Sequence, residues 1–440
     1  MVVGAGLSGL FTACELLAGG IDDVLVVEKS SEPGGVTRTI FRDGFSLEPG
    51  AGSFSLPHPD LSSLLDRIGA ETVPVLPAAS VRYVYTDDRL VALPSSPGAL
   101  FAPILPLTAK LRALVEPLIR SPASEDESLM LFCQRRFGRT AGELLGWLMA
   151  SGVFAGDPRR LSAGSAFPSL TALEVEGGSV IKGAIRRRRT RAGPRSGVHI
   201  PVGGMAGVAT AAARFLGDRL RTGFEVESVR EAAGGWVIDG TESLNADAVV
   251  VASGPREASG MLGGELGAHL ARAVSAPVVV AGLGGSQDTS RIPPGYGVLV
   301  HAGESMISRG VLFESSYAPD RSPRGSWLVK VIAGGATHPG AVEWDERALV
   351  DRLVNELSQL IGADFEPTFV EVVRHRTGIP QYEIGHNRWL QEIDTLVSTR
   401  PGLFLTGWGY RGVGVAHIAR DARAIAGKVV SGVSRSNASD

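Results

Sequence analysis

In VVGAGLSGL, at residues 2–10, a short apolar strand runs directly into a glycine-rich turn. Gly4 allows a tight strand-to-helix turn, Gly6 lets backbone N–H groups approach a pyrophosphate, and Gly9 lets the helix lie close to the sheet. Negative phosphate then meets the positive end of the helix. The spacing predicts the first half of a dinucleotide-binding βαβ unit.

A second strand and a second glycine-rich turn extend this pattern. VLVVE at residues 24–28 ends in Glu28, which is placed to accept hydrogen bonds from an adenosine ribose. Late in the chain, the apolar strand at 402–407 leads into WGYRGVGV at 408–415 and then into a helix, whose positive end can stabilise negative charge on a reduced flavin ring. FAD is long enough to need both glycine-rich helix starts, so the two turns favour FAD over a nicotinamide nucleotide.

Length and composition limit the class of protein. The 440 residues exceed the ~250 to 300 at which single cores stop growing, so two or three domains are expected. A net charge of −3 gives no general attraction to nucleic acid, and no nucleic-acid partner is expected. Cys14 and Cys133 are too few for a disulfide framework, which favours a reducing cytoplasm. No apolar run reaches the ~18 residues of a membrane span, and no signal peptide is evident.

The order of patterns along the chain predicts an α/β fold. A discontinuous Rossmann-like FAD-binding domain carries a mixed α+β substrate domain and an inserted helical domain. We assign 1–80, 197–272 and 391–432 to the FAD-binding domain, 81–96 (a hairpin) and 273–390 to the substrate domain, 97–196 to the helical domain and 433–440 to a flexible tail. Strands are expected at 224–229, 235–238, 248–252, 278–283, 298–301 and 327–332, and a helix at 346–361.

With these segments assembled, the chain resembles the flavin-containing amine oxidase superfamily and, within it, the protoporphyrinogen oxidase family. The motifs that carry the resemblance are GVFAGD (152–157), LS (161–162), FPSL (167–170), GYGVLV (295–300), GIPQY (378–382), GH (385–386) and residues 407–415. They stand in the family's order over nearly the whole chain. Because no cysteine follows Cys133, we expect FAD to be bound without a covalent link through cysteine at the late turn.

The resemblance assigns site residues by motif. The implied FAD contacts are Gly4, Ala5, Gly6, Leu7, Ser8, Gly9, Glu28, Lys29, Gly34, Gly35, Arg38, Gly50, Ala51, Gly52, Ser53, Val226, Trp408, Val413, Gly414 and Val415, with Val226 on a strand against the adenine. The implied substrate contacts are Arg82, Gly152, Tyr296, Gly297, Leu299 and Ile332. A guanidinium at Arg82 can fork onto a propionate carboxylate, while the other residues give aromatic, aliphatic and bare-backbone walls. No catalytic acid or base and no metal is assigned, since the flavin carries the chemistry.

The reaction implied by the resemblance is the six-electron oxidation of protoporphyrinogen IX to protoporphyrin IX in haem biosynthesis. Molecular oxygen re-oxidises the flavin and hydrogen peroxide forms. Coproporphyrinogen III oxidation is the alternative, and its four propionates would need more positive charge in the site. An amine oxidase, a carotenoid desaturase and a non-catalytic FAD-bound scaffold are weaker alternatives. A transient contact with the next haem-pathway enzyme is a further expected partnership.

One basic run stands apart from these motifs. RRRRTR at residues 186–191, with Arg195 nearby, is expected in a loop of the helical domain. It is either a solvated loop or a contact with anionic lipid headgroups, at about 1 kcal/mol per basic residue near the surface. The apolar segment 98–108 is too short to span a bilayer but could dip into its interface. The sequence therefore leaves peripheral membrane association open for a cytoplasmic protein.

Overall fold

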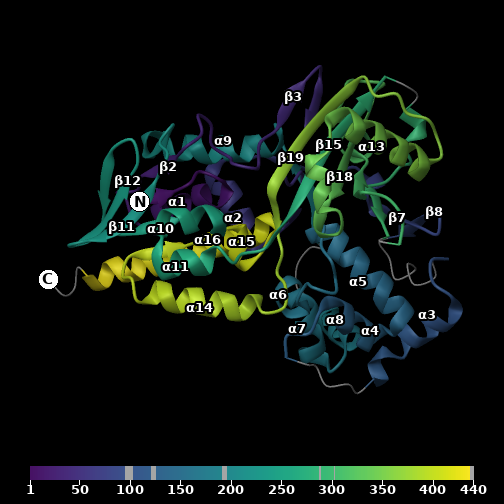
Figure 1. The fold of residues 1–440 in the computed structure, drawn as a ribbon, viewed down its shortest axis with the longest axis horizontal. Helices are drawn as coiled ribbons and strands as arrows, with labels where there is room; N and C mark the ends of the chain where they lie inside the picture. Colours follow the sequence, from purple (N-terminus) through teal and green to yellow (C-terminus); the bar gives the residue numbers. More distant parts are fainter. Residues whose placement is uncertain (95–102, 120–124, 191–195, 287–288, 302, 437–440) are drawn as a thin grey trace.

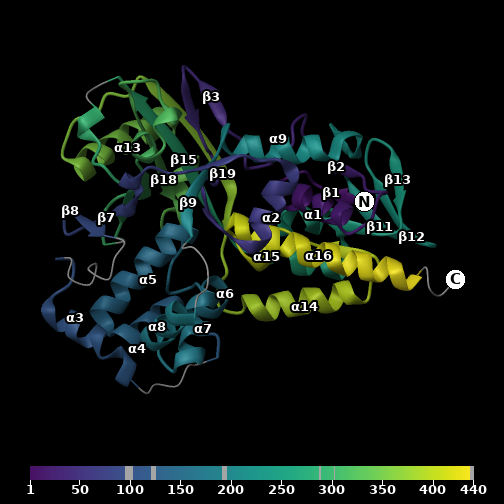
Figure 2. The same cartoon turned by 180° about the vertical axis from the view of Figure 1, so that it is seen from behind.

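The computed structural model describes residues 1–94, 103–119, 125–190, 196–286, 289–301 and 303–436. Three regions are visible in Figure 1 and, from behind, in Figure 2. One contains a parallel sheet and both chain ends, one contains a larger twisted sheet, and one consists of helices only. The domain boundaries given above remain predictions, because the fold does not by itself divide the chain at those residues.

The parallel sheet has the strand order β10-β2-β1-β14-β20, so three distant parts of the chain meet in it. Its strands are β1 (Val2–Val3), β2 (Val26–Glu28), β10 (Leu220–Thr222), β14 (Val249–Val251) and β20 (Leu403–Leu405). Val2 lies opposite Val26 on one side and Val250 on the other. The short first strand is therefore the centre of the sheet, as a dinucleotide-binding unit requires.

Helices cover both faces of this sheet because alternate strand residues point to opposite sides. Val2 packs into a core with α1 (Leu7–Ala18), α2 (Pro59–Ile68), α9 (Gly204–Leu216) and α16 (Val415–Ser436). Val3 faces a second core with α10 (Pro255–Leu262), α11 (Gly264–Leu270) and α14 (His386–Ser398). The sheet is thus doubly wound.

Small sheets and hairpins flank the parallel sheet. β11 (Ser228–Ala232), β12 (Gly235–Asp239) and β13 (Ser243–Ala246) form an antiparallel meander. The expected strand at 224–229 is wrong for most of its length, since residues 223–227 form no ladder and β11 begins at Ser228. β3 (Ile40–Arg42) pairs with β4 (Phe45–Leu47), and β9 (Gly197–Pro201) lies between β5 (Phe54–Leu56) and β6 (Thr72–Pro74).

The larger sheet has seven strands in the order β19-β15-β18-β17-β16-β7-β8. They are β7 (Val81–Thr86), β8 (Arg89–Pro94), β15 (Ser275–Gly285), β16 (Gly297–Val300), β17 (Ser308–Leu312), β18 (Trp327–Gly334) and β19 (Phe369–Pro380). The predicted hairpin β7–β8 joins it through a parallel pairing with β16. α13 (Glu346–Ile361) has the predicted bounds and packs on one face of the sheet, burying Leu349, Leu353 and Leu357.

The helical region lies against the larger sheet through α5 (Figure 1). Its helices are α3 (Leu107–Leu114), α4 (Leu129–Phe137), α5 (Arg139–Phe154), α6 (Ala163–Ala166), α7 (Pro168–Gly177) and α8 (Val180–Thr190). The loop expected for the basic run is wrong: Arg186–Arg189 form the last turns of α8, because strong helix formers continue the helix there. Arg191 and Arg195 lie outside the described residues. In the described part of the chain, no helix is long and apolar enough to cross a bilayer.

Candidate FAD and substrate site

The two glycine-rich turns meet at the carboxyl edge of the parallel sheet. Gly4 follows β1, Gly407 follows β20, and the end of β14 lies between them. A Cβ at Gly4 (φ +100°) would lie 3.4 Å from the Ala252 carbonyl oxygen, and one at Gly407 (φ +144°) would lie 3.5 Å from the Ser253 carbonyl oxygen. Both turns therefore border Ser253, which follows β14 at the edge where open α/β sheets bind ligands.

The leading turn has the close packing that its glycines predict. A Cβ at Gly9 would lie 1.8 Å from the Gly4 carbonyl oxygen, so any side chain there would push α1 off the strand. At Gly6, by contrast, a Cβ would meet nothing within 4 Å. The Glu28 carboxylate accepts from the Ala5 N–H (2.7 Å) and the Ser30 N–H (2.9 Å), which joins the end of β2 to the turn.

The Gly34–Gly35 segment closes one side of this turn. The Gly34 N–H donates to the Ala5 carbonyl (2.8 Å), and a Cβ at Gly35 would lie 3.3 Å from the Gly6 Cα. Lys29 and Arg38 are exposed near the same edge. Three of the predicted cofactor segments, Gly4–Gly9, Glu28 and Gly34–Gly35, thus meet at this turn.

The residues at this edge fit a dinucleotide. The Ser253 hydroxyl is buried and has no hydrogen-bond partner among the described residues. It stands between the two turns, where a polar ligand group would satisfy it. The open space at Gly6 lies at the N-terminus of α1, where backbone N–H groups and the helix dipole favour a pyrophosphate. Gly4–Gly9 would therefore hold the diphosphate of FAD.

The predicted Gly50–Ser53 loop is held from behind by two buried cations. Lys330 Nζ donates to the Glu48 carbonyl (3.2 Å) and the Gly50 carbonyl (3.3 Å), and Arg321 Nη2 donates to the Gly52 carbonyl (2.6 Å). Sequence motifs missed both residues. A lone lysine within the apolar strand Trp327–Gly334 was the available signal.

Two carboxylates balance these cations. Arg321 pairs with Glu314, and Lys330 Nζ lies 3.7 Å from the same carboxyl group. Burial lowers the pKa of Lys330 and raises the pKa of Glu48. The cluster turns alternate carbonyls of the loop toward the protein interior, which leaves the other side of the loop to face the ligand space.

Among the predicted substrate residues, Tyr296 contacts a predicted cofactor residue. Its hydroxyl lies 2.8 Å from Ser53 Oγ, so a predicted substrate contact and a predicted cofactor contact are hydrogen-bonded to each other. Arg82 Cζ lies 5.4 Å from the Tyr296 ring centroid, and the Tyr317 ring stacks on the Tyr296 ring with centroids 4.7 Å apart. Burial raises the pKa of Tyr296, so its hydroxyl stays protonated at neutral pH.

Leu299, Ile332 and Gly152 lie together on the next part of this face. Leu299 and Ile332 are both cross-strand neighbours of Gly310, so they share one face of the large sheet. A Cβ at Gly152 in α5 would lie 3.3 Å from Leu299 Cδ1. Gly297 belongs to the same strand as Leu299 and has φ +155°. Gly152, Leu299 and Ile332 therefore line one surface between the sheet and α5, and Arg82, on the neighbouring strand β7, pairs with Gly297.

The trailing turn contains α15 (Trp408–Arg411) and leads into α16, which begins at Val415. Trp408, Val413 and Gly414 are half-buried at this turn. The predicted strand position of Val226 is wrong. Val226 lies in the extended segment between β10 and β11, which forms no ladder, and its half-buried side chain packs against the core that contains Val3. Alternation alone could not separate an extended segment from a paired strand.

Together these features define an FAD-dependent oxidoreductase with a doubly wound nucleotide-binding sheet. The chain belongs to the flavin-containing amine oxidoreductase family, whose model matches residues 7–427. A mitochondrial protoporphyrinogen oxidase from Nicotiana tabacum is 28% identical, with 92% of this chain and 89% of the relative covered. A coproporphyrinogen III oxidase from Bacillus subtilis (strain 168) is 25% identical, with 94% of each chain covered.

The fold is also similar to that of solved structures. A crystal structure from Exiguobacterium sp. 255-15, provisionally named a protoporphyrinogen oxidase, superposes with a TM-score of 0.82 at 19% identity and covers 98% of both chains. The predicted superfamily, fold class, FAD cofactor and oxidoreductase class are thereby confirmed. The individual site residues remain predictions, which the geometry above places but does not test.

Proposed function

We propose that the protein oxidises protoporphyrinogen IX to protoporphyrin IX with molecular oxygen as the electron acceptor. The observation that carries this proposal is the Ser53–Tyr296 hydrogen bond, which joins the predicted cofactor loop to the predicted substrate surface. Porphyrinogen-oxidising relatives match along more than nine-tenths of the chain. The site and the relatives support one reaction class, and a transient contact with the next haem-pathway enzyme belongs to the same proposal.

The chain's own residues would bind, orient and shield the substrate. Arg82 would hold a propionate, with its guanidinium placed over the Tyr296 ring. Leu299 and Ile332 would pack on the macrocycle, and the bare backbone of Gly152 would allow it to approach α5. FAD supplies the hydride acceptor when it is bound. Excluding water and aligning the reacting carbon with the cofactor are the contributions of the protein.

The experiment compares two porphyrinogens aerobically. Purified protein should be yellow, and protoporphyrinogen IX should give porphyrin fluorescence several-fold faster than the spontaneous rate, with hydrogen peroxide as by-product. A higher kcat/KM with coproporphyrinogen III would replace the proposed substrate with the alternative. If the protein binds flavin but porphyrin forms from both compounds only at the spontaneous rate, the proposal is contradicted. The remaining interpretation would then be a non-catalytic FAD-bound scaffold.

We also infer that the helical region contacts an anionic membrane surface. Large apolar side chains are exposed along α3 and the turn after it, with Leu107 at 71% and Leu118 at 77% exposure. α8 lies beside this turn, since Lys182 Nζ donates to the Pro117 carbonyl (2.8 Å). Arg186–Arg189 are exposed at the end of α8. An apolar strip next to a basic helix end suits a headgroup layer.

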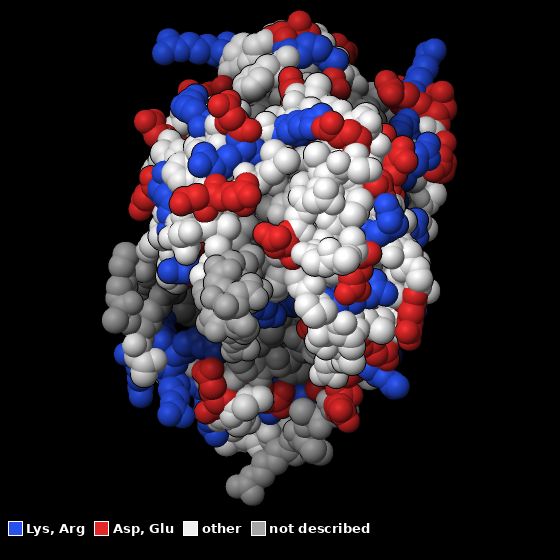
Figure 3. Space-filling model, turned by 90° about the vertical axis from the view of Figure 1, so that its left-hand side faces the viewer, with Lys and Arg blue, Asp and Glu red and all other residues white. Residues whose placement is uncertain are grey.

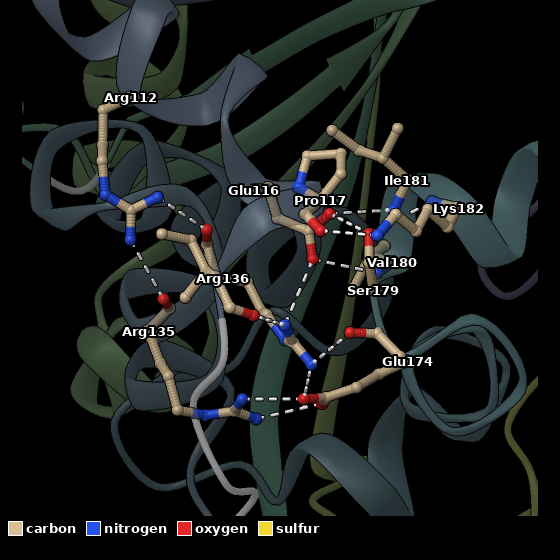
Figure 4. Close-up of polar contacts among 12 residues, drawn as sticks. Arg112, Glu116, Pro117, Arg135, Arg136, Glu174, Ser179, Val180, Ile181 and Lys182 are labelled. Atoms are coloured by element: carbon tan, nitrogen blue, oxygen red, sulfur yellow. Dashed lines mark hydrogen bonds and ion pairs between the residues drawn. The ribbon is translucent and has the colours of Figure 1, made fainter.

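The start of α8 is fixed rigidly enough to present this basic end. Glu116 is fully buried and accepts from the Val180 N–H (3.0 Å) and the Ile181 N–H (3.1 Å) (Figure 4). Arg136 pairs with Glu116 (3.5 Å) and with Glu174, which ties α8 to α4 and α7. In Figure 3, which shows the left-hand side of Figure 1, Lys and Arg side chains gather at the lower left while both signs alternate higher up.

Vesicle binding tests this second proposal. Phosphatidylcholine vesicles with phosphatidylserine should sediment the protein, and the double variant Arg188→Glu and Arg189→Glu should bind at least tenfold more weakly, since each basic residue contributes about 1 kcal/mol. Arg347→Glu, an exposed arginine on α13, is the control and should bind as the wild type does. If binding changes neither with the phosphatidylserine content nor with the charge reversal, the proposed contact with an anionic membrane surface is ruled out.

A further inference from the structure

The turn Trp408–Gly412 depends on a neighbouring segment for its position. Gly407 (φ +144°) and Gly412 (φ +134°) flank α15, and both have backbone angles that side-chain-bearing residues rarely adopt. Flexible flanks leave the turn free to shift unless contacts from outside fix it. Those contacts come from the segment Gln381–His386, which the sequence motifs singled out without giving it a role.

A single oxygen atom of Tyr382 spans both ends of the turn. Its hydroxyl donates to the Trp408 carbonyl and accepts from the Gly412 N–H (2.7 Å). The side chain is 3% exposed, and burial raises the pKa of its hydroxyl, which therefore remains a donor at neutral pH. Both ends of the turn are thus hydrogen-bonded to one buried group.

His386 adds a third contact in the middle of the same turn. Its Nε2 lies 2.9 Å from the Tyr410 carbonyl oxygen, and its ring stacks on Tyr382 with centroids 4.1 Å apart. Burial lowers the pKa of His386, so the neutral ring donates from Nε2 to that carbonyl. The stacked side chains of Tyr382 and His386 therefore hold the turn in place through three hydrogen bonds.

The other side of this segment is bonded to the helical region. The Tyr382 carbonyl accepts from the Ser162 N–H (2.9 Å), the Ile384 N–H donates to the Arg160 carbonyl (3.0 Å), and the Gly385 N–H donates to Asp126 Oδ2 (2.6 Å). Gly152 lies in the same helical region, near the C-terminal end of α5. One short segment therefore sets the trailing turn relative to the helical wall of the substrate surface.

We propose that Tyr382 is a positioning residue whose hydroxyl fixes the redox end of FAD against the wall that carries Gly152. His386 supports it through the stacked ring and the bond to the turn. The inference rests on the proposed function for the identity of the hydride donor. The effect of Tyr382 on the flavin environment, however, can be measured without any substrate. A displaced turn would change both the environment of the flavin ring and the alignment of the donor carbon.

Tyr382→Phe tests this inference, because it keeps the ring, the burial and the stack but leaves the Trp408 carbonyl and the Gly412 N–H without their partner. FAD content should stay as in the wild type, since the leading turn holds the diphosphate. The visible flavin absorption band and the midpoint potential should shift. We expect kcat to fall by about 10-fold or more with KM within about twofold, because a misplacement of ~1 Å can cost on the order of 100-fold in rate.

Tyr410→Phe is the matched control on the same turn. The Tyr410 hydroxyl is buried and has no hydrogen-bond partner among the described residues, so its removal should leave the spectrum, potential and kcat unchanged. Wild-type spectrum, potential and kcat in Tyr382→Phe would overturn the inference. If Tyr382→Phe does not fold, His386→Phe tests the same inference, because it removes the hydrogen bond to the Tyr410 carbonyl and should shift the same spectrum and potential. A wild-type protein that holds FAD but oxidises no porphyrinogen would refute the proposed function, while the spectral shift would still decide the role of Tyr382.

Discussion

Single glycines carry the clearest agreement between sequence and structure at the residue scale. Gly4 has a positive φ (+100°) at the predicted tight turn, and Gly9 has the close helix–strand approach that the spacing predicts. Lys330 and Arg321 show the limit, because nothing near them in the sequence says that they support the loop at Gly50. Backbone requirements are local and readable, whereas the partners of a buried charge depend on the folded arrangement.

A methyl group at Gly6, introduced by Gly6→Ala, should weaken FAD binding without destabilising the fold. Gly6 has φ −67°, which alanine adopts without strain, and a Cβ there meets nothing within 4 Å, so the fold should keep its stability. The added methyl group would stand in the space assigned to the diphosphate. We expect FAD affinity to fall at least tenfold, measured by titrating the flavin-free protein with FAD and following flavin fluorescence.

Gly9→Ala is the informative comparison. Its Cβ would lie 1.8 Å from the Gly4 carbonyl oxygen, so this variant should lose folding stability even without FAD. Equal FAD affinity in Gly6→Ala and wild type would show that the diphosphate does not bind at this turn.

Strands and helices were predicted best where the pattern was long. α13 has the bounds expected from its apolar spacing, and the hairpin β7–β8 forms around its turn as expected. The segment 224–227 and the basic end of α8 were predicted wrongly, because extended backbone without a ladder partner alternates like a strand and a charge run can continue a helix. Short patterns do not reveal their tertiary partners.

Strand β17 carries a buried arginine at an irregular position of its ladder. Its pairing with β18 shifts register between Ser308 and Gly310, and Arg309 at this bulge is 1% exposed. Arg309 Nη2 donates to the Met306 carbonyl, but Nε and Nη1 have no partner among the described residues, and burial lowers the pKa of the guanidinium. Arg309→Met removes these buried donors, so we expect the free energy of unfolding to rise by about 1 kcal/mol or more in urea titrations.

An exposed substitution controls for the loss of charge. Arg347→Met on α13 should change the free energy of unfolding by no more than about 0.5 kcal/mol. A lower urea midpoint for Arg309→Met than for the wild type would mean that the guanidinium stabilises the bulge.

The site forms at the whole-molecule scale, where three regions meet (Figures 1 and 2). The Ser53–Tyr296 hydrogen bond joins residues 243 positions apart, and Tyr382 connects the helical region to a turn near the end of the chain. The family resemblance supplied most of the candidate residues, but pattern and spacing could not place them against one another. Their arrangement depends on a parallel sheet assembled from three separate segments.

We infer that the two glycine-rich turns hold FAD between them and that the adjoining surface presents a porphyrinogen to it, so that bound FAD would supply the hydride acceptor. Anaerobic stopped-flow mixing of the yellow protein with protoporphyrinogen IX checks this arrangement. We predict that the flavin absorption bleaches on mixing and that porphyrin fluorescence rises only after air is admitted and the flavin cycles. A flavin that stays oxidised, with fluorescence growing no faster than in a protein-free blank, would contradict the account.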